Sequence, residues 1–435
     1  MSRESDVSRR ELVKTAGTVG AIGVGLAGCS SGGDSGGSTD ESTEASGGGD
    51  DTESGGGDTD SGSGGSEAEL QLTIGGVMNP PGSAWNGEQP SGHWEFEERI
   101  EERTDGRIQV DNVADGQLCG ELTCPEKVSQ GTVEIGSASI GNSTKFYPMN
   151  DIWMLPFTFP SPQSLGYVHQ KAETWEQWWV PFAQEFGVVP LWMHAPTLRS
   201  INIGLDRSDS KDSAHRAPAD VEGMDCRRTG SQVSGIALSE WGMNPVSVSW
   251  ADSLQGLRTG VVGGMEAAIS PVSAYGGNMA DSLGESVHNR WTIHNDVKWA
   301  SVEWLKGLSE ENRTIIAEES RKLYRDLVRR NRQIHQEVLG TYTNDPSEEA
   351  AIVEHDLQVN YIEGDEQQQW ADIVTYDQNP DLYTDVIESA DQIGVDGEAF
   401  HEYLHDSARE SAVPDDFYGD SYTIDAWWDD YLKEM

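Results

Sequence analysis

Basic residues are scarce in this sequence. Its 435 residues include 29 Lys and Arg against 75 Asp and Glu, which gives a formal net charge of −46. This composition argues against a nucleic-acid partner, because phosphate binding requires a basic surface. In dilute salt such self-repulsion opposes the compact state, whereas at about 1 M salt the screening length falls to about 3 Å. The charge is spread along the whole chain, so we interpret it as halophilic adaptation; the alternative is a protein that binds cations or basic partners.

Cysteine is also rare. Cys29 belongs to the export segment described below, and three others remain, Cys119, Cys124 and Cys226. None has the paired Cys-x-x-Cys spacing of a structural zinc site. Cys119 and Cys124 are able to close a short loop outside the cell if a turn through Gly120 brings their Cα atoms within about 7 Å. The sequence alone leaves this bridge open.

The N-terminus lacks an apolar run as long as a membrane helix. The apolar stretch 16–28 is short and glycine-rich, whereas a span needs about 20 apolar residues. Arg9 and Arg10 precede it, and the arrangement resembles a twin-arginine export signal. The sequence LAGC at 26–29 resembles a lipobox, at which a lipoprotein is cleaved and acylated on Cys29. We therefore expect a lipoprotein anchored through Cys29 to the outer face of the cytoplasmic membrane.

Residues 30–67 contain no Lys, Arg or aromatic residue and consist almost wholly of Gly, Ser, Thr, Asp and Glu. Such a segment buries too little apolar surface to offset its ordering entropy, and its like charges repel. We expect a disordered acidic tether between signal segment 1–29 and a globular part. This order of parts indicates location, and both receptors and enzymes are displayed in this way.

The globular part alternates strand and helix patterns. Residues 70–74 (LQLTI) alternate apolar and polar side chains, as in a half-buried strand. A helix is predicted at 93–103, and further strands at 107–110 and 131–135. This alternation favours an α/β protein with largely parallel sheets.

Several short motifs carry a family resemblance. They are ERTDGRI (102–108), GQL (116–118), QGTVEI (130–135), DIWMLPF (151–157), ADVEGMDCR (219–227), NPV (244–246), Trp250 and LRTGVVGGME (257–266). Their order and spacing over roughly 70–339 resemble the solute-binding proteins of tripartite ATP-independent periplasmic (TRAP) transporters, the DctP-type family. The resemblance implies a two-lobed, periplasmic-binding-protein-like α/β fold with a ligand cleft between the lobes. It also implies a long lobe-spanning helix, for which 309–339 is the candidate.

The resemblance implies a receptor rather than an enzyme. Such a protein captures a small organic acid, closes by a hinge motion, and delivers the acid to the membrane subunits of a TRAP permease, with no cofactor and no metal. The division expected from it is lobe 1 at 68–195 with part of 284–330, lobe 2 at 196–283 with part of 331–395, and a C-terminal helical region at 396–435.

Four residues of the second lobe are candidates for holding the acid. By the resemblance, Arg227 occupies the position of the arginine that grips the substrate carboxylate, and a guanidinium matches a carboxylate as a planar fork. Arg199 matches a second arginine of some members, Trp250 an aromatic that packs on the ligand, and Glu266 an acidic position near the cleft. Glu266 is expected to orient Arg227, accept a substrate hydroxyl or join a cation site. The alternatives are surface ion pairs for both arginines and a core position for Trp250.

Other features bear on the ligand less directly. Loops that follow strands of the first lobe, where α/β folds place ligands, contain the candidates Asn79, Trp85, Asn142 and Tyr147.

The chain has Ala267 where the family commonly has an asparagine, and Gly263 where it has an aspartate. The identity of the acid, its affinity, the help of a cation and the oligomeric state therefore stay open.

Two alternative functions were weighed against this one. His401, Glu402 and His405 satisfy H-E-x-x-H, which on a helix places two imidazoles on one face for zinc and a glutamate beside them. A chance match in a chain of this composition is on the order of a few per cent, and no third histidine follows at metzincin spacing. A lipoprotein receptor of an ATP-driven (ABC) importer has the same tether and two lobes, and only the spacing of the second-lobe motifs argues against it.

Overall fold

The computed structural model describes residues 68–77, 92–195, 197–205, 214–248, 250–269, 282–333, 348, 350–354, 357–410 and 423–435. These residues all belong to one structural unit, 65–435. The predictions made for the signal segment with Cys29, for the tether, and for Asn79 and Trp85 lie outside the described residues.

The first sheet has the strand order β2-β1-β3-β10-β4. Its strands are β1 (Leu70–Gly75), β2 (Ile108–Val113), β3 (Ile135–Ala138), β4 (Val188–His194) and β10 (Asp296–Ser301). β1 pairs parallel to β2 and β3, while β10 pairs antiparallel to β3 and β4.

The second sheet has the order β11-β9-β5-β8-β6-β7. Its strands are β5 (Leu198–Gly204), β6 (Asp225–Arg228), β7 (Asn244–Ser247), β8 (Gly264–Ala267), β9 (Leu283–Ile293) and β11 (Gln358–Tyr361). β6 lies parallel to its neighbours β7 and β8, whereas β5 is antiparallel to β8 and β9.

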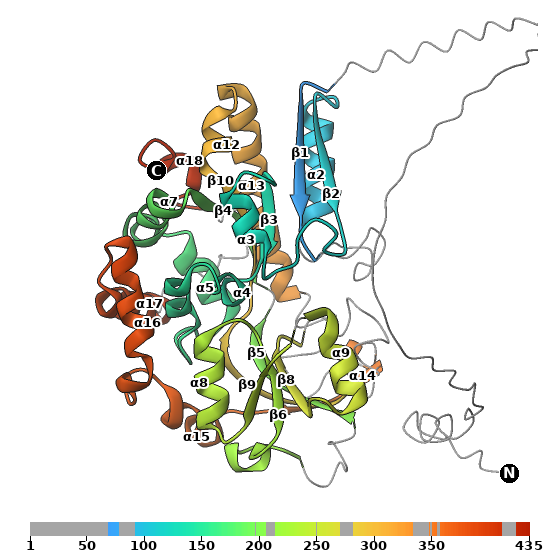
Figure 1. Cartoon of the computed structure of the whole chain (residues 1–435), viewed down its shortest axis with the longest axis vertical. Coiled ribbons are helices and arrows are strands. Elements are labelled where there is room, and N and C mark those ends of the chain that lie inside the picture. The colour runs from blue at the N-terminus through green and yellow to red at the C-terminus, as the bar shows by residue number, and fades with distance from the viewer. Residues whose placement is uncertain are drawn as a thin grey trace, which may run out of the picture. The chain divides into compact units, whose positions relative to one another are not determined.

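Both sheets are mixed, which corrects the expectation of largely parallel sheets. The chain passes from the first sheet to the second between β4 and β5, and it returns between β9 and β10. These four long strands carry the antiparallel pairs, because a chain that leaves one sheet and comes back reverses direction. The two sheets with their covering helices form the two lobes of the predicted fold (Figure 1).

Helices cover both sheets. In the first part of the chain they are α2 (His93–Arg103), α3 (Cys124–Ser129), α4 (Ile140–Ser143), η1 (Pro148–Met154), α5 (Pro162–His169), α6 (Ala172–Thr174), η2 (Trp175–Trp179) and α7 (Val180–Phe186). The middle part has η4 (Pro218–Val221), α8 (Gln232–Glu240), α9 (Trp250–Thr259), α12 (Val302–Gly307) and α13 (Glu310–Gln333). The last part has α14 (Ala351–Glu354), α15 (Gly364–Val374), η6 (Pro380–Tyr383), α16 (Thr384–Glu388), η7 (Ser389–Ile393), α17 (Gly397–Arg409) and α18 (Trp428–Tyr431).

The local predictions for β1, β2 and α2 are confirmed, and one strand is displaced. β3 begins at Ile135, because Gly131 adopts the left-handed conformation (φ 65°) and turns the chain before the strand starts. The predicted long helix is observed as α13 from Glu310 to Gln333, and its continuation toward 339 lies outside the described residues. Ser309 accepts a hydrogen bond from the backbone N–H of Asn312 (3.2 Å), which supplies the expected helix start.

The core of the first lobe is rich in tryptophan. Trp153 stacks on Trp179 with ring centroids 5.3 Å apart, and Phe400 of α17 stacks on Trp178 at 4.4 Å. Phe400, Leu404 and Ala408 recur every four residues and give α17 one buried face. The C-terminal helix therefore closes the aromatic core with its apolar face.

Candidate ligand-binding site

Arg227 lies on β6, between the neighbouring strands β7 and β8, and is 2 % exposed. Its Nε donates to the carbonyl oxygen of Val248 at 3.1 Å, while its buried Nη1 has no hydrogen-bond partner among the described residues. Burial lowers the pKa of Arg227 below its ordinary value, which reflects the cost of removing this charge from water. The site thus holds a buried cation with an unused donor.

Trp250, at the start of α9, packs on this arginine. The Cζ atom of Arg227 lies 5.6 Å from the centroid of the Trp250 ring, within the range of a cation–π contact. The half-buried indole fixes the plane of the guanidinium. The predicted contact between Trp250 and a ligand stays a prediction.

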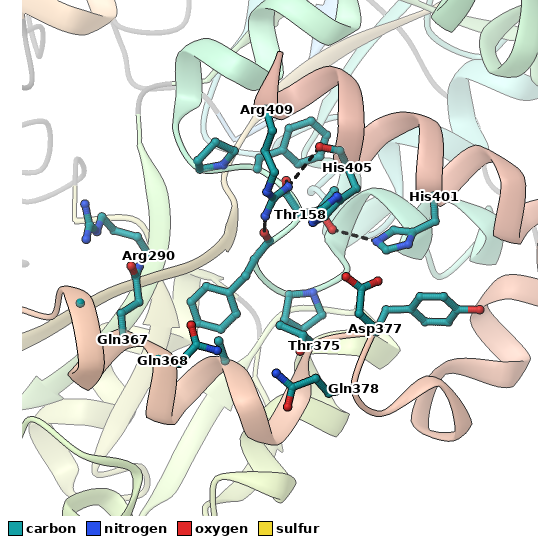
Figure 2. Close-up of a pocket in the computed structure, with 17 residues that line it drawn as sticks. Thr158, Arg290, Gln367, Gln368, Thr375, Asp377, Gln378, His401, His405 and Arg409 are labelled. Carbon is teal, nitrogen blue, oxygen red and sulfur yellow. Dashed lines mark hydrogen bonds between the residues drawn. The ribbon is translucent and has the colours of Figure 1, made fainter. Parts of the chain in front are cut away.

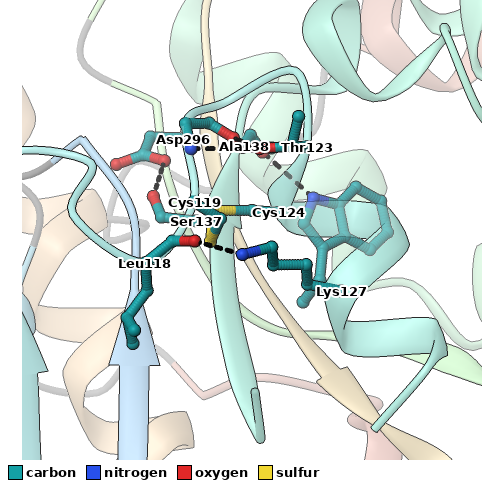
Figure 3. The surroundings of a disulfide bond; sticks show 10 residues. Leu118, Cys119, Thr123, Cys124, Lys127, Ser137, Ala138 and Asp296 are labelled. Carbon is teal, nitrogen blue, oxygen red and sulfur yellow. Dashed lines mark hydrogen bonds between the residues drawn. A yellow bond between two sulfur atoms is a disulfide. The ribbon is translucent and has the colours of Figure 1, made fainter. Parts of the chain in front are cut away.

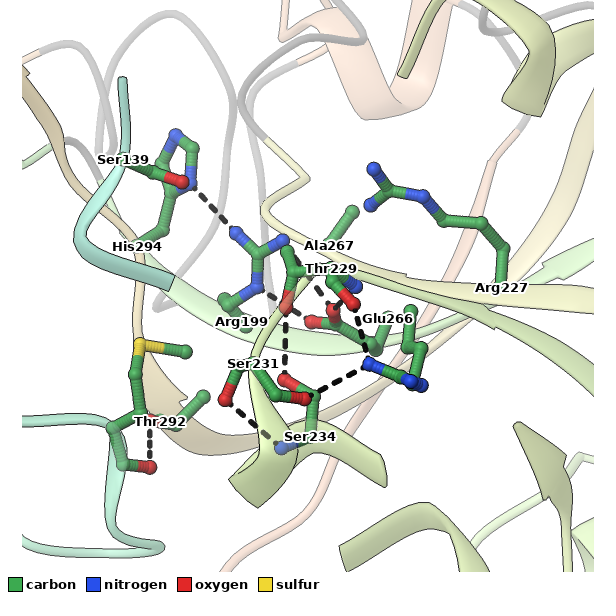
Figure 4. A network of polar contacts seen from close by, with 12 residues as sticks. Ser139, Arg199, Arg227, Thr229, Ser231, Ser234, Glu266, Ala267, Thr292 and His294 are labelled. Carbon is green, nitrogen blue, oxygen red and sulfur yellow. Dashed lines mark hydrogen bonds and ion pairs between the residues drawn. The ribbon is translucent and has the colours of Figure 1, made fainter. Parts of the chain in front are cut away.

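Arg199 and Glu266 form a buried ion pair beside Arg227 (Figure 4). Arg199 Nε lies 2.5 Å from Glu266 Oε2, and Arg199 Nη1 lies 3.1 Å from His294 Nδ1. The other carboxylate oxygen of Glu266 accepts the backbone N–H of Thr229 at 2.7 Å. Glu266 therefore binds Arg199 rather than Arg227. The alternative of a surface ion pair for Arg199 is wrong, because this pair lies in the interior, where Glu266 is 0 % exposed.

Glu121 is a site residue that the sequence analysis missed. It accepts a hydrogen bond from the side-chain amide of Asn142, and Ser139 Oγ lies 3.5 Å from it. Burial raises the pKa of Glu121, and Asp296 adds to the rise, whereas the charges of Arg227 and Arg199 oppose it. The carboxyl group therefore lies close enough to both arginines to interact with their charges, although it comes from the first lobe. The GQL motif at 116–118 placed the loop, but no local pattern indicated which side chain faces the arginines.

Contacts between β6–α8 and the loops of the first lobe surround this site. The side-chain oxygen of Asn142 accepts the backbone N–H of Gly230 at 3.3 Å. Asp151 of η1 accepts from Ser231 Oγ at 2.5 Å and from the backbone N–H of Gln232 at 2.9 Å, at the start of α8. The two lobes thus meet at the segment that follows Arg227, as expected for a closed cleft.

Tyr147 does not lie with these residues. It is 2 % exposed, its ring packs edge-on against Phe182 at 5.0 Å, and its hydroxyl donates to the carbonyl oxygen of Pro125 at 3.1 Å. Burial raises the pKa of this hydroxyl to about 12. The structure places Tyr147 in the aromatic core, and we do not retain it in the site. Asn142 lies on α4 and donates to Glu121, and its contact with a ligand stays a prediction.

A disulfide joins Cys119 to Cys124, with Cα atoms 5.0 Å apart (Figure 3). The bridge that the sequence left open is therefore present, and the loop that it closes contains Glu121. The bridge is packed tightly: a Cβ atom at Gly75 would lie 2.9 Å from Cys119 Sγ, and one at Gly136 would lie 3.2 Å from Cys124 Cβ. The short loop between β2 and α3 is thus held against the ends of β1 and β3. Cys226 is buried and is not part of a disulfide.

The H-E-x-x-H motif lies on α17, away from Arg227. His401 is buried, its Nε2 lies 3.2 Å from Thr158 Oγ1, and burial lowers its pKa to about 4. Glu402 points to solvent on the opposite side of the helix from the core. Within the part of the chain that the structure describes, no group of three or more His, Cys, Asp or Glu side chains is arranged to hold a metal ion.

None of the described helices combines the length and the apolar character needed to cross a bilayer.

Comparisons with known proteins concern the chain as a whole. The chain is 23 % identical over 171 residues to a solute-binding protein of Chromohalobacter salexigens, an alignment that covers 39 % of this chain and 48 % of the relative. The chain spans about half the length of the curated relatives it matches. The model of the bacterial extracellular solute-binding proteins, family 7, matches residues 88–374, more than half of the chain.

Solved structures with the same fold are TRAP periplasmic solute-binding proteins. One from Roseobacter denitrificans, with bound β-D-glucuronate, has a TM-score of 0.58 at 19 % identity and covers 78 % of this chain and 99 % of its own. One from Desulfovibrio salexigens, with bound orotic acid, has a TM-score of 0.63 at 14 % identity with the same coverage. These structures share the two-lobed fold. By the match over 88–374, this chain belongs to the bacterial extracellular solute-binding proteins, family 7.

Proposed function

We propose that this protein is an extracytoplasmic receptor that captures a small organic acid between its lobes and delivers it to a TRAP permease. The observation that carries the proposal is Arg227, a buried guanidinium whose Nη1 has no partner among the described residues. A buried donor without an acceptor is destabilising, and a buried charge more so. A carboxylate relieves both penalties, and each hydrogen bond to a charged group contributes about 1.5–3 kcal/mol.

Membership of a solute-binding family and the acids bound by the solved relatives support a carboxylate ligand. Arg199 is a weaker candidate for direct contact, because Glu266 and His294 already engage its guanidinium. We infer that its role is to hold Glu266 and, through Glu266, the backbone of Thr229 beside Arg227.

Glu121 narrows the class of acid. One of its oxygens accepts from Asn142, and Oε1 accepts no hydrogen bond from the described residues. A carboxyl group facing the arginines favours a ligand that carries a hydroxyl as well as a carboxylate, because the hydroxyl donates to Glu121 while the carboxylate binds Arg227. We therefore propose a hydroxylated acid, such as a sugar acid or a hydroxy acid, over a plain dicarboxylate.

A ligand screen tests the receptor function. The protein, kept in molar NaCl, is titrated with mono- and dicarboxylates, keto acids, hydroxy acids and sugar acids, with thermal unfolding and tryptophan fluorescence as readouts. A ligand at 100 times its Kd adds about 2.7 kcal/mol to the free energy of unfolding. We expect Arg227→Lys to weaken binding, because ammonium keeps the charge but loses the planar fork. Arg321→Gln, at an exposed ion pair with Asp430, is the matched control and leaves binding unchanged. Binding that is unaffected by Arg227→Lys contradicts the proposal.

The membrane partners are tested separately. We propose that Cys29 carries the lipid anchor and that the receptor works at the outer membrane face with the permease subunits. Cys29→Ser is expected to release the protein from membranes without changing its affinity for the acid. Membrane subunits that co-purify with the anchored protein and include an ATPase would instead assign it to an ABC importer.

A further inference from the structure

A cavity of about 490 Å³ lies apart from Arg227, between the C-terminal helices and the segment of the first lobe that joins η1 to α5. Its walls come from residues 156–160, from Arg290 on β9, from α15 with residues 375–378, and from α17 (Figure 2). This volume falls within the range of about 300–1,000 Å³ that small-molecule sites have. His401 and His405 of the H-E-x-x-H motif both line it, so the motif marks this cavity and not a zinc centre among the described residues.

The charge of the cavity wall is opposite to that of the chain. Acidic residues outnumber Lys and Arg by 75 to 29 in the sequence, yet the wall has the two arginines Arg290 and Arg409 and one carboxylate, Asp377. Burial holds the pKa of His401 at about 4, so this imidazole is neutral near pH 7. Three glutamines complete the wall, and each of their amide groups is fixed by one hydrogen bond to the protein: Gln367 donates to Asn289, and Gln368 and Gln378 donate to Asp372.

Two wall residues have strained backbones. Phe157 and Arg290 have φ angles of 59° and 54°, and the other two described non-glycine residues with positive φ are aspartates in turns. Asn and Asp tolerate this conformation, whereas for bulky side chains it is unfavourable. Strain of this kind gathers at functional sites and persists only where the surroundings enforce it. Here the backbone N–H of Phe157 donates to Trp291 at 2.6 Å, and Arg409 Nη2 donates to the Phe157 carbonyl at 2.6 Å.

Donors remain for a ligand on Arg409. Arg290 is held differently, because its Nη2 donates to the carbonyl oxygen of Ile362 at 2.9 Å and lies 3.8 Å from the carboxylate of Glu363. Arg409 Nη1 donates to Thr158 and His405, and Nη2 to Phe157, which uses three of the five guanidinium donors. The anchored guanidinium of Arg409 is pre-organised, because its position is set before any ligand arrives.

The cavity also lies where the lobes join. Gln367 of α15 donates to the backbone carbonyl of Asn289 on β9, and Trp370 of α15 donates to Arg216, so α15 packs on the second lobe. α17 is tied instead to the first lobe through Thr158 and Phe400. A ligand in this cavity contacts segments of both lobes.

We propose that this cavity is a second ligand site, which binds a small oxyanion (a polycarboxylate or a phosphate group) independently of the Arg227 site. The two arginines of the wall and the unused donors of Arg409 point to an anion. This proposal is independent of the proposed receptor function, because it does not involve Arg227.

The test uses the full protein with Arg227→Met, so that the first site is disabled, in NaCl of fixed concentration. Citrate and inorganic phosphate are titrated separately by calorimetry, and their comparison decides between the two oxyanion classes. Thr375 lines the cavity, and Thr375→Asp introduces a carboxylate there, while Thr375→Asn introduces the same shape without charge. We expect one equivalent of one probe to bind in the Arg227→Met and Thr375→Asn proteins, and to bind about tenfold or more weakly with Thr375→Asp.

Arg409→Gln is the second variant, and we expect it to abolish binding through the loss of guanidinium donors. Circular dichroism and thermal unfolding show whether each variant is folded, and the Asp and Asn variants at 375 keep the test independent of Arg409. Equal affinities of the Thr375→Asp and Thr375→Asn proteins overturn the proposal. So does the absence of binding by both probes at millimolar concentration in the Arg227→Met protein.

Discussion

At the scale of single residues, Arg227 combines burial with an incomplete set of hydrogen bonds. Its energetic contribution therefore differs between the free and the liganded protein. In the free protein the guanidinium is a desolvated charge with one bond to Val248 and an unpartnered Nη1 among the described residues. In the complex that we propose, the same atoms hold the acid. Binding sites commonly trade stability for function in this way.

The variant Arg227→Met tests whether Arg227 lowers the stability of the ligand-free protein. The substitution keeps the length and apolar stem of the side chain and removes the charge. Because the removed group is buried and incompletely paired, we expect the free energy of unfolding of the ligand-free protein to stay equal or to rise. The affinity for the acid should fall at least about 30-fold, since breaking a buried charge pair costs about 2 kcal/mol or more. Chemical denaturation with and without the acid gives both quantities; a large loss of stability without ligand would contradict this account.

The buried carboxyl group of Asp151 predicts that the stability of the protein depends on pH. Burial raises its pKa from 3.8 to about 7. A raised pKa means that the folded state binds the proton more tightly than the unfolded state. Below about pH 4, protonated Asp151 therefore contributes up to about 4 kcal/mol to the free energy of unfolding. This contribution is lost as the pH rises toward 7.

Asp151→Asn should abolish this dependence, because the amide is neutral throughout and still accepts from Gln232. The difference in free energy of unfolding between wild type and variant, measured from pH 4 to pH 8, should change in favour of the variant as the pH rises. Asp385→Asn, on the exposed side of α16, controls for the loss of a negative charge. A difference that is constant with pH contradicts the assignment.

At the scale of elements, the loop between β2 and α3 owes its shape to the Cys119–Cys124 bridge. A disulfide that closes so short a loop stabilises by about 2 kcal/mol in the chain-entropy model. We expect Cys119→Ser/Cys124→Ser to lose this amount and also to bind the acid more weakly, because Glu121 lies inside the loop. Reduction of the wild-type protein should reproduce both effects. Unchanged affinity in the reduced protein would show that Glu121 does not contact the ligand.

The helix that follows this loop, α3, packs closely against β3. A Cβ atom at Gly136 would lie 2.6 Å from Val128 Cγ2, whereas one at Gly120 meets no atom within 4 Å. Gly136→Ala should therefore cost about 1–3 kcal/mol of unfolding free energy, as overpacking in a core does. Gly120→Ala, in the disulfide loop, should be nearly neutral. Thermal denaturation of the two variants distinguishes them, and equal stabilities would refute the close approach.

At the scale of the whole molecule, the net charge of −46 predicts stability that rises with salt. Repulsion among acidic side chains is screened when the Debye length falls from about 10 Å at 0.1 M to about 3 Å at 1 M. We expect the free energy of unfolding to increase over this range in NaCl and in KCl alike. Betaine at equal osmolality, which carries no net charge, should reproduce little of the increase. If the free energy of unfolding does not change with salt, the interpretation of the acidic composition as halophilic adaptation is wrong.

The sequence by itself determined the features that depend on neighbouring residues. Period-two alternation predicted β1, helix patterning predicted α2, and the range 309–339 was the candidate for the long helix observed as α13. The order of the motifs indicated the family and singled out Arg227. These signals are local, because strand and helix periodicities and helix caps involve residues only a few positions apart.

Only the tertiary structure decided which side chains meet. Arg199 and Glu266 are 67 residues apart and pair because β5 and β8 are antiparallel neighbours in one register. A one-residue shift of that register would turn the side chains to opposite faces. Likewise Glu121 faces the arginines, and His401 lines a cavity rather than a zinc site among the described residues. Their surroundings come from segments far apart in the chain, and no pattern within a single segment specifies such a meeting.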